Sequence, residues 1–348
     1  MNELIASGKA IPLNPPPPGG PIRRLPLLGT GRPAPIVRGD WIKHFPGGEG
    51  DNNCPRFYYI RDGFGCIFNC DYCYLGRQAF RHEDGAEFNP DFPTLYEQVA
   101  RWLQRPGELG LILGEVSDAW GWAHMPAILE RNRRLIEMFR GQERHTLIFL
   151  TKSGRVHQYL DGITPSDRIA LSWSVNAPAV AHVYEMGARQ AQARLRDARF
   201  CRERGWRVRL RIDPMIPVVG WRDLYTDLAE IVARDVRPEQ VTCGSWRPRR
   251  QDEMYKRASE FRSVMEPGPD RRLRIKNRLE MYRTVWSVLL GRVPQLSLCK
   301  EELDIEAALY TSFGIREQAC NCLGCPQEPV GLIPLRALLR ANGDPSVR

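Results

Sequence analysis

"RIALSWSVN" (residues 168–176) alternates bulky apolar side chains with small or polar ones along its whole length. A period of two is typical of a β-strand whose two faces meet different surroundings. One face carries Ile169, Leu171, Trp173 and Val175, and the other carries Ala170, Ser172, Ser174 and Asn176. The next apolar run, "WRVRLRI" (206–212), repeats the pattern with Arg207, Arg209 and Arg211 on its polar face. The two runs predict neighbouring strands of one sheet with an apolar and a polar face.

The pattern continues on both sides as short apolar runs separated by amphipathic helical stretches. Predicted strands cover 57–63, 110–115, 145–151, 168–176, 206–213 and 239–246. Predicted helices lie near 93–104, 126–140, 154–160, 189–204 and 222–235. Six strand-helix units in series are the signature of a parallel sheet, which right-handed crossovers curl into a partial barrel. We therefore predict an α/β fold, a partial (β/α)6 barrel.

The barrel prediction assigns the two faces. Helices cover the outside of such a barrel, so the apolar sets should point outward and the Ser, Asn and Arg sets into the lumen. Functional sites of these folds lie at the carboxyl ends of the strands. The alternative is that these are edge strands with a solvated face. The side chains at the expected strand ends are Glu115, Lys152, Asn176 and Arg211.

Composition divides the 348 residues into three parts. Residues 1–50 are dense in Pro and Gly and are expected to form an extended arm. The barrel is expected over 51–265 and a helical, cysteine-rich extension over 266–348. No apolar run of about 18 residues occurs and the N-terminus lacks an export-signal pattern, so we expect a cytoplasmic protein with no membrane partner. The net charge of +9 suggests an anionic partner.

"GCIFNCDYCYLG" (65–76) places Cys66, Cys70 and Cys73 within eight residues, after the first predicted strand. Three thiolates can hold three irons of a [4Fe-4S] cluster and leave the fourth iron open. A structural zinc site is the alternative and would need a fourth ligand, for which Cys54 is nearest.

This motif resembles that of the radical S-adenosylmethionine (SAM) superfamily in its spacing, in the aromatic Tyr72 before the last cysteine and in its place after the first strand. The resemblance implies that the open iron binds SAM and that one electron cleaves it to a 5′-deoxyadenosyl radical. It also implies an external one-electron reductant of the flavodoxin or ferredoxin type.

Five further segments resemble the spore photoproduct lyase branch of that superfamily, whose type enzyme reverses a thymine dimer. They read "CDYCYLG", "FLTKSG", "SWSVN", "EMGARQAQARL" and "DPMIPVVGWRDLY". The likeness implies SAM contacts or near neighbours for Tyr72, Tyr74, Ser117, Lys152, Ser174 and Asn176. Glu115 stands where many radical SAM enzymes carry a carboxylate for the SAM ammonium, and Arg211 is a further cofactor-binding candidate. Except for Lys152, each also has an ordinary interpretation as a strand-end or turn residue.

One departure from that branch concerns a hydrogen donor. The lyase returns a hydrogen atom to its product from a cysteine in a segment that here reads Glu115-Val116-Ser117-Asp118. Cys243 is a substitute candidate, although a cysteine in an apolar strand is more often packed core. DNA dimer repair and a duplex DNA partner are therefore not expected.

A second departure is a cysteine pattern near the C-terminus. Cys299, Cys320, Cys322 and Cys325 follow the spacing C-x20-C-x-C-x2-C. Four thiolates can hold an auxiliary [4Fe-4S] cluster or a structural zinc. Cys201 is interpreted as helix packing, and Cys54 is left without a role.

These features predict a radical SAM enzyme that abstracts a hydrogen atom from a small anionic nucleoside or nucleotide. The leading expectation is sulfur insertion from the auxiliary cluster, in nucleoside natural product (antibiotic) biosynthesis. The alternatives are oxidation or epimerisation with that cluster as electron acceptor, lyase-type DNA repair, and a non-enzymatic zinc-binding protein.

Overall fold

The computed structural model describes residues 40–47, 52–68, 70–73, 75, 87–248, 261, 264–266, 272–315 and 320–324. Tyr74 and Cys325, two of the predicted site residues, lie outside this set. So does most of the predicted N-terminal arm.

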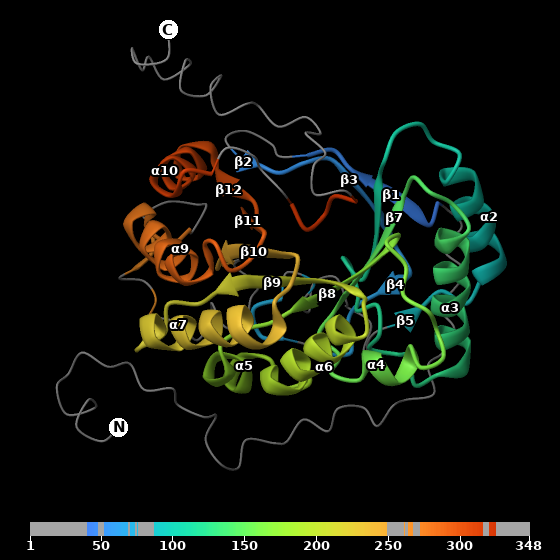
Figure 1. Cartoon of the computed structure of the whole chain (residues 1–348), viewed down its shortest axis with the longest axis horizontal. Helices are drawn as coiled ribbons and strands as arrows, with labels where there is room; N and C mark the ends of the chain where they lie inside the picture. The colour runs from blue at the N-terminus through green and yellow to red at the C-terminus, as the bar shows by residue number, and fades with distance from the viewer. Residues whose placement is uncertain are drawn as a thin grey trace, which may run out of the picture.

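An eight-stranded sheet in the order β1-β3-β6-β7-β8-β9-β10-β11 forms the centre of the fold. It curls into a half-barrel (Figure 1). All neighbours from β3 to β11 pair in parallel, and β1 pairs antiparallel with β3. The strands are β1 (Ile42–Phe45), β3 (Phe57–Ile60), β6 (Gly110–Leu113), β7 (Thr146–Thr151), β8 (Ile169–Ser174), β9 (Arg207–Met215), β10 (Gln240–Ser245) and β11 (Gln295–Leu298). The predicted α/β partial barrel is confirmed.

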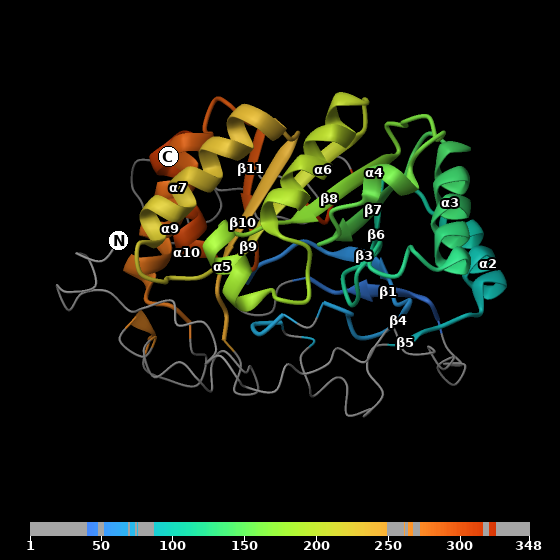
Figure 2. The ribbon, with the colours of Figure 1, turned by 90° about the horizontal axis from the view of Figure 1, so that it is seen from below.

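Helices line the convex side of the sheet (Figure 2). They are α2 (Phe92–Trp102), α3 (Pro126–Arg140), α4 (Val156–Tyr159), α5 (Pro178–Tyr184), α6 (Ala191–Glu203), α7 (Trp221–Ile231) with the π-helical turn η1 (Val232–Val236), α9 (Ile275–Leu289) and α10 (Leu303–Phe313). Two small ribbons complete the described structure: β2 (Asn52–Asn53) with β12 (Glu301–Glu302), and β4 (Gly63–Phe64) with β5 (Glu87–Phe88).

The faces of the strands separate as the alternation predicted. Leu171 and Trp173 of β8 and Leu210 of β9 pack in the large core shared with the helices. Ala170, one residue out of phase, packs instead in a smaller cluster on the inner face together with Cys320 and Cys322. The lumen of the half-barrel is therefore filled by residues from near the C-terminus.

Two boundaries differ from those predicted. The stretch 42–45 lies inside the predicted extended arm but forms β1, because it contains no Pro or Gly and its backbone pairs with β3. The sheet also continues past the predicted barrel boundary at 265, since β11 pairs in parallel with β10. The connecting helix α9 packs against α7 and β10. Sequence patterning missed β11 because it is only four residues long.

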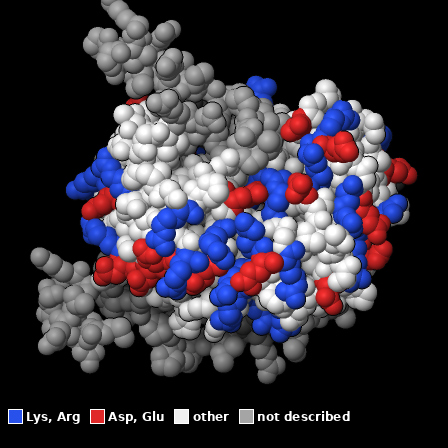
Figure 3. Space-filling view, viewed as in Figure 1, with Lys and Arg blue, Asp and Glu red and all other residues white. Residues whose placement is uncertain are grey.

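No helix among the described residues is both long and apolar enough to cross a membrane. On the face in Figure 3, basic side chains of the described residues are interspersed with acidic ones. Several of these charges pair locally, such as Arg199 with Glu203 on α6 and Arg222 with Glu280 between α7 and α9.

Candidate functional site

The loop that follows β4 carries Cys66, Cys70 and Cys73. Cys70 is buried, and the other two thiols are partly buried. The Cys73 amide donates to the Cys70 carbonyl (3.0 Å), and the Asp71 amide donates to the Tyr184 carbonyl at the end of α5 (2.9 Å). These bonds hold the cysteine loop against the loop that leaves β8.

The thiols influence one another electrostatically. Burial raises the pKa of Cys66 well above its ordinary value, and the neighbouring Asp118, Cys73 and Cys70 raise it further. Burial also raises the pKa of Cys70, against which Lys152 acts. Within the described residues, no three Cys, His, Asp or Glu side chains are already grouped as a metal site. The donor set itself, three soft thiolates on one short loop, suits an iron-sulfur cluster with one open iron.

Lys152 stands next to this loop at the end of β7. Its Nζ donates to Ser174 Oγ at the end of β8 (2.6 Å) and lies 5.8 Å from the centre of the Tyr72 ring. Burial lowers the pKa of Lys152, but Glu185 and Cys70 more than compensate and the pKa is raised. Lys152 is therefore held as a cation beside the cysteines. The structure thus brings together three of the predicted SAM-site residues, Tyr72, Lys152 and Ser174.

A buried ion pair supports this cation. Glu185, just after α5, accepts hydrogen bonds from Tyr72 Oη and Arg194 Nη2. Arg194 also donates to the Ser174 carbonyl (2.7 Å) and the Arg189 carbonyl (2.9 Å). Burial alone would raise the pKa of Glu185, but Arg194 and Lys152 hold it below its ordinary value.

Asn176 and Ser117 are committed to other partners. The Asn176 side chain donates to the Pro214 carbonyl (2.9 Å) and accepts from Tyr225 Oη of α7 (2.8 Å). Asn176 does not follow the alternation of β8, because the strand ends at Ser174. Ser117 Oγ donates to Asp62 (2.5 Å), which also pairs with Arg131 of α3 (2.8 Å).

Glu115 and Arg211 form an ion pair on the inner face (3.1 Å). Arg211 Nη2 also donates to Cys322 Sγ (3.1 Å). Burial lowers the pKa of Arg211, but Cys322 and Glu115 raise it more strongly. Both residues therefore lie beside a second group of thiols, which contains Cys299, Cys320 and Cys322.

Comparisons with known proteins identify the family. The sequence model described as spore photoproduct lyase matches residues 53–244, more than half of the 348 residues. The chain belongs to the spore photoproduct lyase family. The curated spore photoproduct lyase of Geobacillus sp. (strain Y412MC61) is 25% identical over 181 residues, 51% of this chain and 52% of that protein. The match to this relative therefore spans about half of the relative's length.

Solved structures share the fold. Spore photoproduct lyase complexed with dinucleoside spore photoproduct matches with a TM-score of 0.60 and 18% identity, covering 76% of this chain and 81% of that chain. A double mutant of spore photoproduct lyase with bound AdoMet and dinucleoside spore photoproduct matches with a TM-score of 0.57 and 19% identity, covering 69% and 75% of the two chains. These likenesses place the chain in the radical SAM, spore photoproduct lyase-like branch, as predicted.

Cys243 faces away from the lumen of this family member. On β10 it is paired with Ile212, whereas its neighbour Thr242 is paired with the inner-face Arg211. The thiol is fully buried, and burial raises its pKa to about 12. Cys243 therefore packs against the helices, and its proposed role as a substitute hydrogen donor is wrong. Cys201 packs in the same helix-side core, as interpreted from the sequence.

Sequence reasoning did not identify Glu185, Arg194 and Asp118 as site residues. The Asp118 carboxylate accepts from Thr151 Oγ1 (2.6 Å) and the Lys152 amide (2.6 Å), which fixes the end of β7. Glu185 and Arg194 lie in the family-like segment "EMGARQAQARL", which was the available signal. Helical periodicity gave no hint that the two charges are buried.

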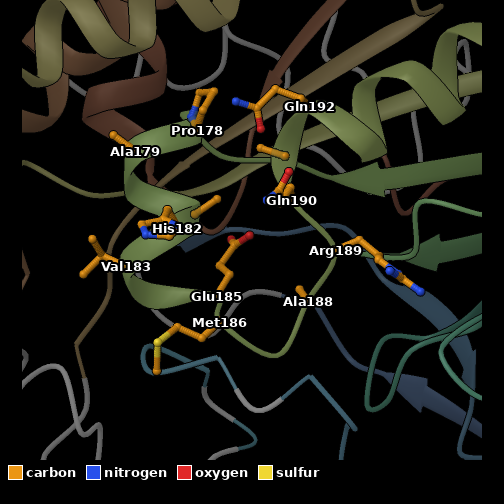
Figure 4. A pocket seen from close by; sticks show the side chains of 12 residues that line it. Pro178, Ala179, His182, Val183, Glu185, Met186, Ala188, Arg189, Gln190 and Gln192 are labelled. Carbon is orange, nitrogen blue, oxygen red and sulfur yellow. The ribbon is translucent and has the colours of Figure 1, made fainter. Parts of the chain in front are cut away.

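An open pocket of about 620 Å³ lies over α5 and the loop leading to α6 (Figure 4). Glu185 and Met186 are among its lining residues. Because Glu185 also bonds Tyr72, this pocket is on the outer side of the same buried network.

Gly187 permits the close contact between the cysteine loop and this α5–α6 loop. A Cβ at position 187 would lie 2.1 Å from the Phe68 carbonyl oxygen. Gly187→Ala is therefore expected to lower the free energy of unfolding by about 1–3 kcal/mol and to reduce iron content. The control Gly141→Ala, where the nearest heavy atom is 3.6 Å away, should change neither. Urea unfolding and iron analysis measure both effects, and unchanged iron in Gly187→Ala would contradict the contact's role.

Proposed function

We propose that this protein is a radical SAM enzyme that abstracts a hydrogen atom from a nucleoside- or nucleotide-type substrate. The observation that carries the proposal is the placement of Lys152 and Ser174 beside the loop of Cys66, Cys70 and Cys73. When bound, the cluster and SAM supply the radical chemistry. The chain's own residues hold, orient and shield these groups.

Within this proposal, Cys66, Cys70 and Cys73 are the cluster ligands. Lys152 and Ser174 are the contacts to polar groups of SAM, because both present polar atoms next to the loop at adjacent strand ends. The Glu185–Arg194 pair is a positioning device that keeps Lys152 charged. Burial of this network keeps water from a reactive intermediate.

The nucleotide-type substrate is supported by the family and by the inner-face charges. The solved relatives were crystallised with a dinucleoside spore photoproduct. Arg211 is buried at the lumen side and is only partly neutralised by Glu115, so an anionic substrate could approach it.

The outcome of the reaction follows from the thiols. Cys243 points to the helices, and Glu115-Val116-Ser117-Asp118 supplies no thiol where the lyase donor is expected. A second thiol group borders the lumen instead, so our leading proposal is a product with a carbon-sulfur bond in place of a carbon-hydrogen bond. Oxidation of the substrate radical at the second centre is the alternative. The family match keeps thymine dimer repair as a further candidate.

Deuterium transfer tests the proposal. Anaerobically reduced protein is incubated with SAM and with nucleosides, nucleotides and a dinucleoside spore photoproduct deuterated on the sugar or base. Deuterium in 5′-deoxyadenosine supports hydrogen abstraction from that substrate, and mass spectrometry of the product then separates sulfur insertion, oxidation and dimer repair. Deoxyadenosine without deuterium from every nucleoside tested would contradict the proposed substrate class.

Lys152→Met is expected to weaken SAM binding. Loss of a charged hydrogen-bond donor costs about 1.5–3 kcal/mol, so the Kd for SAM should rise about 10- to 100-fold. The control Arg155→Met removes an exposed charge three residues away and should leave the Kd unchanged. Equilibrium binding to the cluster-loaded protein measures the effect. An unaltered Kd in Lys152→Met would remove this residue from the SAM site.

A further inference from the structure

The C-terminal stretch 320–324, called here the lumen segment, is fixed firmly on the inner face of the sheet. Arg209 of β9 donates to the carbonyls of Asn321 (3.3 Å), Leu323 (2.6 Å) and Gly324 (3.0 Å). Ser172 Oγ of β8 donates to Asn321 Oδ1 (2.9 Å), and Asn321 Nδ2 donates to the Leu210 carbonyl (3.1 Å). Cys320 and Cys322 are therefore held by the inner-face residues of two strands.

Tight backbone contacts seat the same segment. A Cβ on Gly110 of β6 would lie 2.7 Å from the Gly324 amide nitrogen, and a Cβ on Gly324 would lie 2.8 Å from the Leu109 carbonyl group. Both cysteines are buried, with exposed fractions of 7% for Cys320 and 6% for Cys322. Such placement fixes the two thiols before any ligand is added.

Cys299 approaches the segment from the end of β11. Its amide donates to the Cys243 carbonyl of β10 (2.7 Å), which continues the parallel pairing by one more bond. Its thiol is in the electrostatic neighbourhood of Arg211 and Cys322. The third thiol thus reaches the lumen segment from a different element.

Cys54 reaches the same place from the N-terminal side. The short strands β2 and β12 pair antiparallel, with Asn53 opposite Glu301, so Cys54 lies across from the residues that follow Cys299 (Figure 1). Cys54 packs against the inner-face cluster that contains Cys320 and Cys322. Cys322 is also the nearest charged group acting on it electrostatically. The spacing C-x20-C-x-C-x2-C gave no reason to include Cys54.

Positive charge at this place matches several thiolates. Arg211 is buried against Cys322, and within the described residues its Nε has no hydrogen-bond partner. Arg247 Nη2 lies 3.9 Å from Cys299 Sγ, and Lys300 lies near Cys54. An unpartnered buried donor directed at a thiol group points to an anionic acceptor there. Four thiolates around a metal carry net negative charge and would satisfy it.

We infer that Cys54, Cys299, Cys320 and Cys322 are the four ligands of a second metal centre inside the half-barrel. Cys54 takes the place that the sequence pattern had given to Cys325. The inference deepens the proposed function, on which its role in catalysis rests. Its ligand set stands on the geometry alone. An iron-sulfur cluster and a zinc ion share this ligand chemistry, and metal analysis separates them.

The test uses the full chain with Cys66→Ala, Cys70→Ala and Cys73→Ala as background, so that only the second centre can hold metal. Iron, acid-labile sulfide and zinc are measured after anaerobic purification. We expect about four irons, or one zinc, per chain in this background. Adding Cys54→Ala should reduce the metal at least tenfold. The matched control Cys243→Ala removes a buried thiol from the opposite face of β10 and should leave the metal unchanged.

A folding check accompanies the metal analysis. Cys54→Ala alone, with the first cysteine loop intact, should retain about four irons from that loop. Full metal retention in the background carrying Cys54→Ala, or no metal in the background itself, would overturn the inference. Zinc instead of iron would support the ligand set and overturn the sulfur-donor proposal, so the two failures are distinguishable.

Discussion

Cys66→Ala combined with Cys70→Ala and Cys73→Ala is expected to abolish reductive cleavage of SAM, with no 5′-deoxyadenosine above the level of a protein-free control. The three thiols share one loop and are the sole proposed ligands of the first cluster. Removing them leaves Lys152 and Ser174 with no cluster to position SAM against. Iron should fall from about eight to about four per chain, because the second thiol group is untouched.

The matched control for this prediction is Cys201→Ala together with Cys243→Ala. Both thiols are buried in the helix-side core, so their loss tests general destabilisation without touching either thiol group. This control should keep both its iron and its SAM cleavage. Undiminished deoxyadenosine formation in the triple variant would place the reactive centre elsewhere in the chain.

Arg194→Met is expected to destabilise the protein by about 3–5 kcal/mol, because it leaves Glu185 as an uncompensated buried charge. The exposed fractions of the two side chains are 0% and 1%. A Tyr72 hydroxyl and the Lys152 ammonium remain near the carboxylate but do not replace the lost guanidinium. Denaturant unfolding of the iron-free protein measures the change without interference from the cluster.

Two comparisons make the Arg194 prediction specific. Arg199→Met, on the same helix, breaks an exposed pair with Glu203 and should cost no more than about 0.5 kcal/mol. Arg194→Met combined with Glu185→Met should recover part of the loss, since an apolar pair can replace a buried ion pair. A loss below about 1 kcal/mol in Arg194→Met would contradict a buried, structurally important pair.

The pair also predicts a pH dependence. Because the pKa of Glu185 is held below its ordinary value of 4.5, its pairing stabilises the fold above about pH 4.5. That contribution should disappear as the pH falls through the depressed folded-state pKa. In Arg194→Met, the acid-dependent part of the stability should be smaller, which unfolding measured across this pH range would reveal.

The alternation of β8 and β9 predicted the curled sheet and its two faces because local side-chain pattern and strand geometry share the same period. The cysteine loop was predictable for a similar reason, since its chemistry depends on spacing within one segment. β1 and β11 were missed because each is four residues long and is defined by backbone pairing with a distant strand.

The second thiol group was only partly predictable. Cys299, Cys320 and Cys322 stand out by spacing, whereas Cys54 lies near them through the pairing of β2 with β12. Likewise, Glu185 and Arg194 form a site network only because α5 and α6 fold back on the cysteine loop. Contacts between distant segments carry no local sequence signal.

The most direct test of the central claim is SAM cleavage by the unaltered chain. Anaerobically purified protein, loaded with iron and sulfide and reduced with dithionite, is mixed with SAM, and methionine and 5′-deoxyadenosine are quantified. The account predicts both products in equal amounts, together with their loss in the Cys66, Cys70 and Cys73 variant. Fully iron-loaded, reduced protein that binds SAM but forms no 5′-deoxyadenosine, with or without nucleotide substrates, would contradict it.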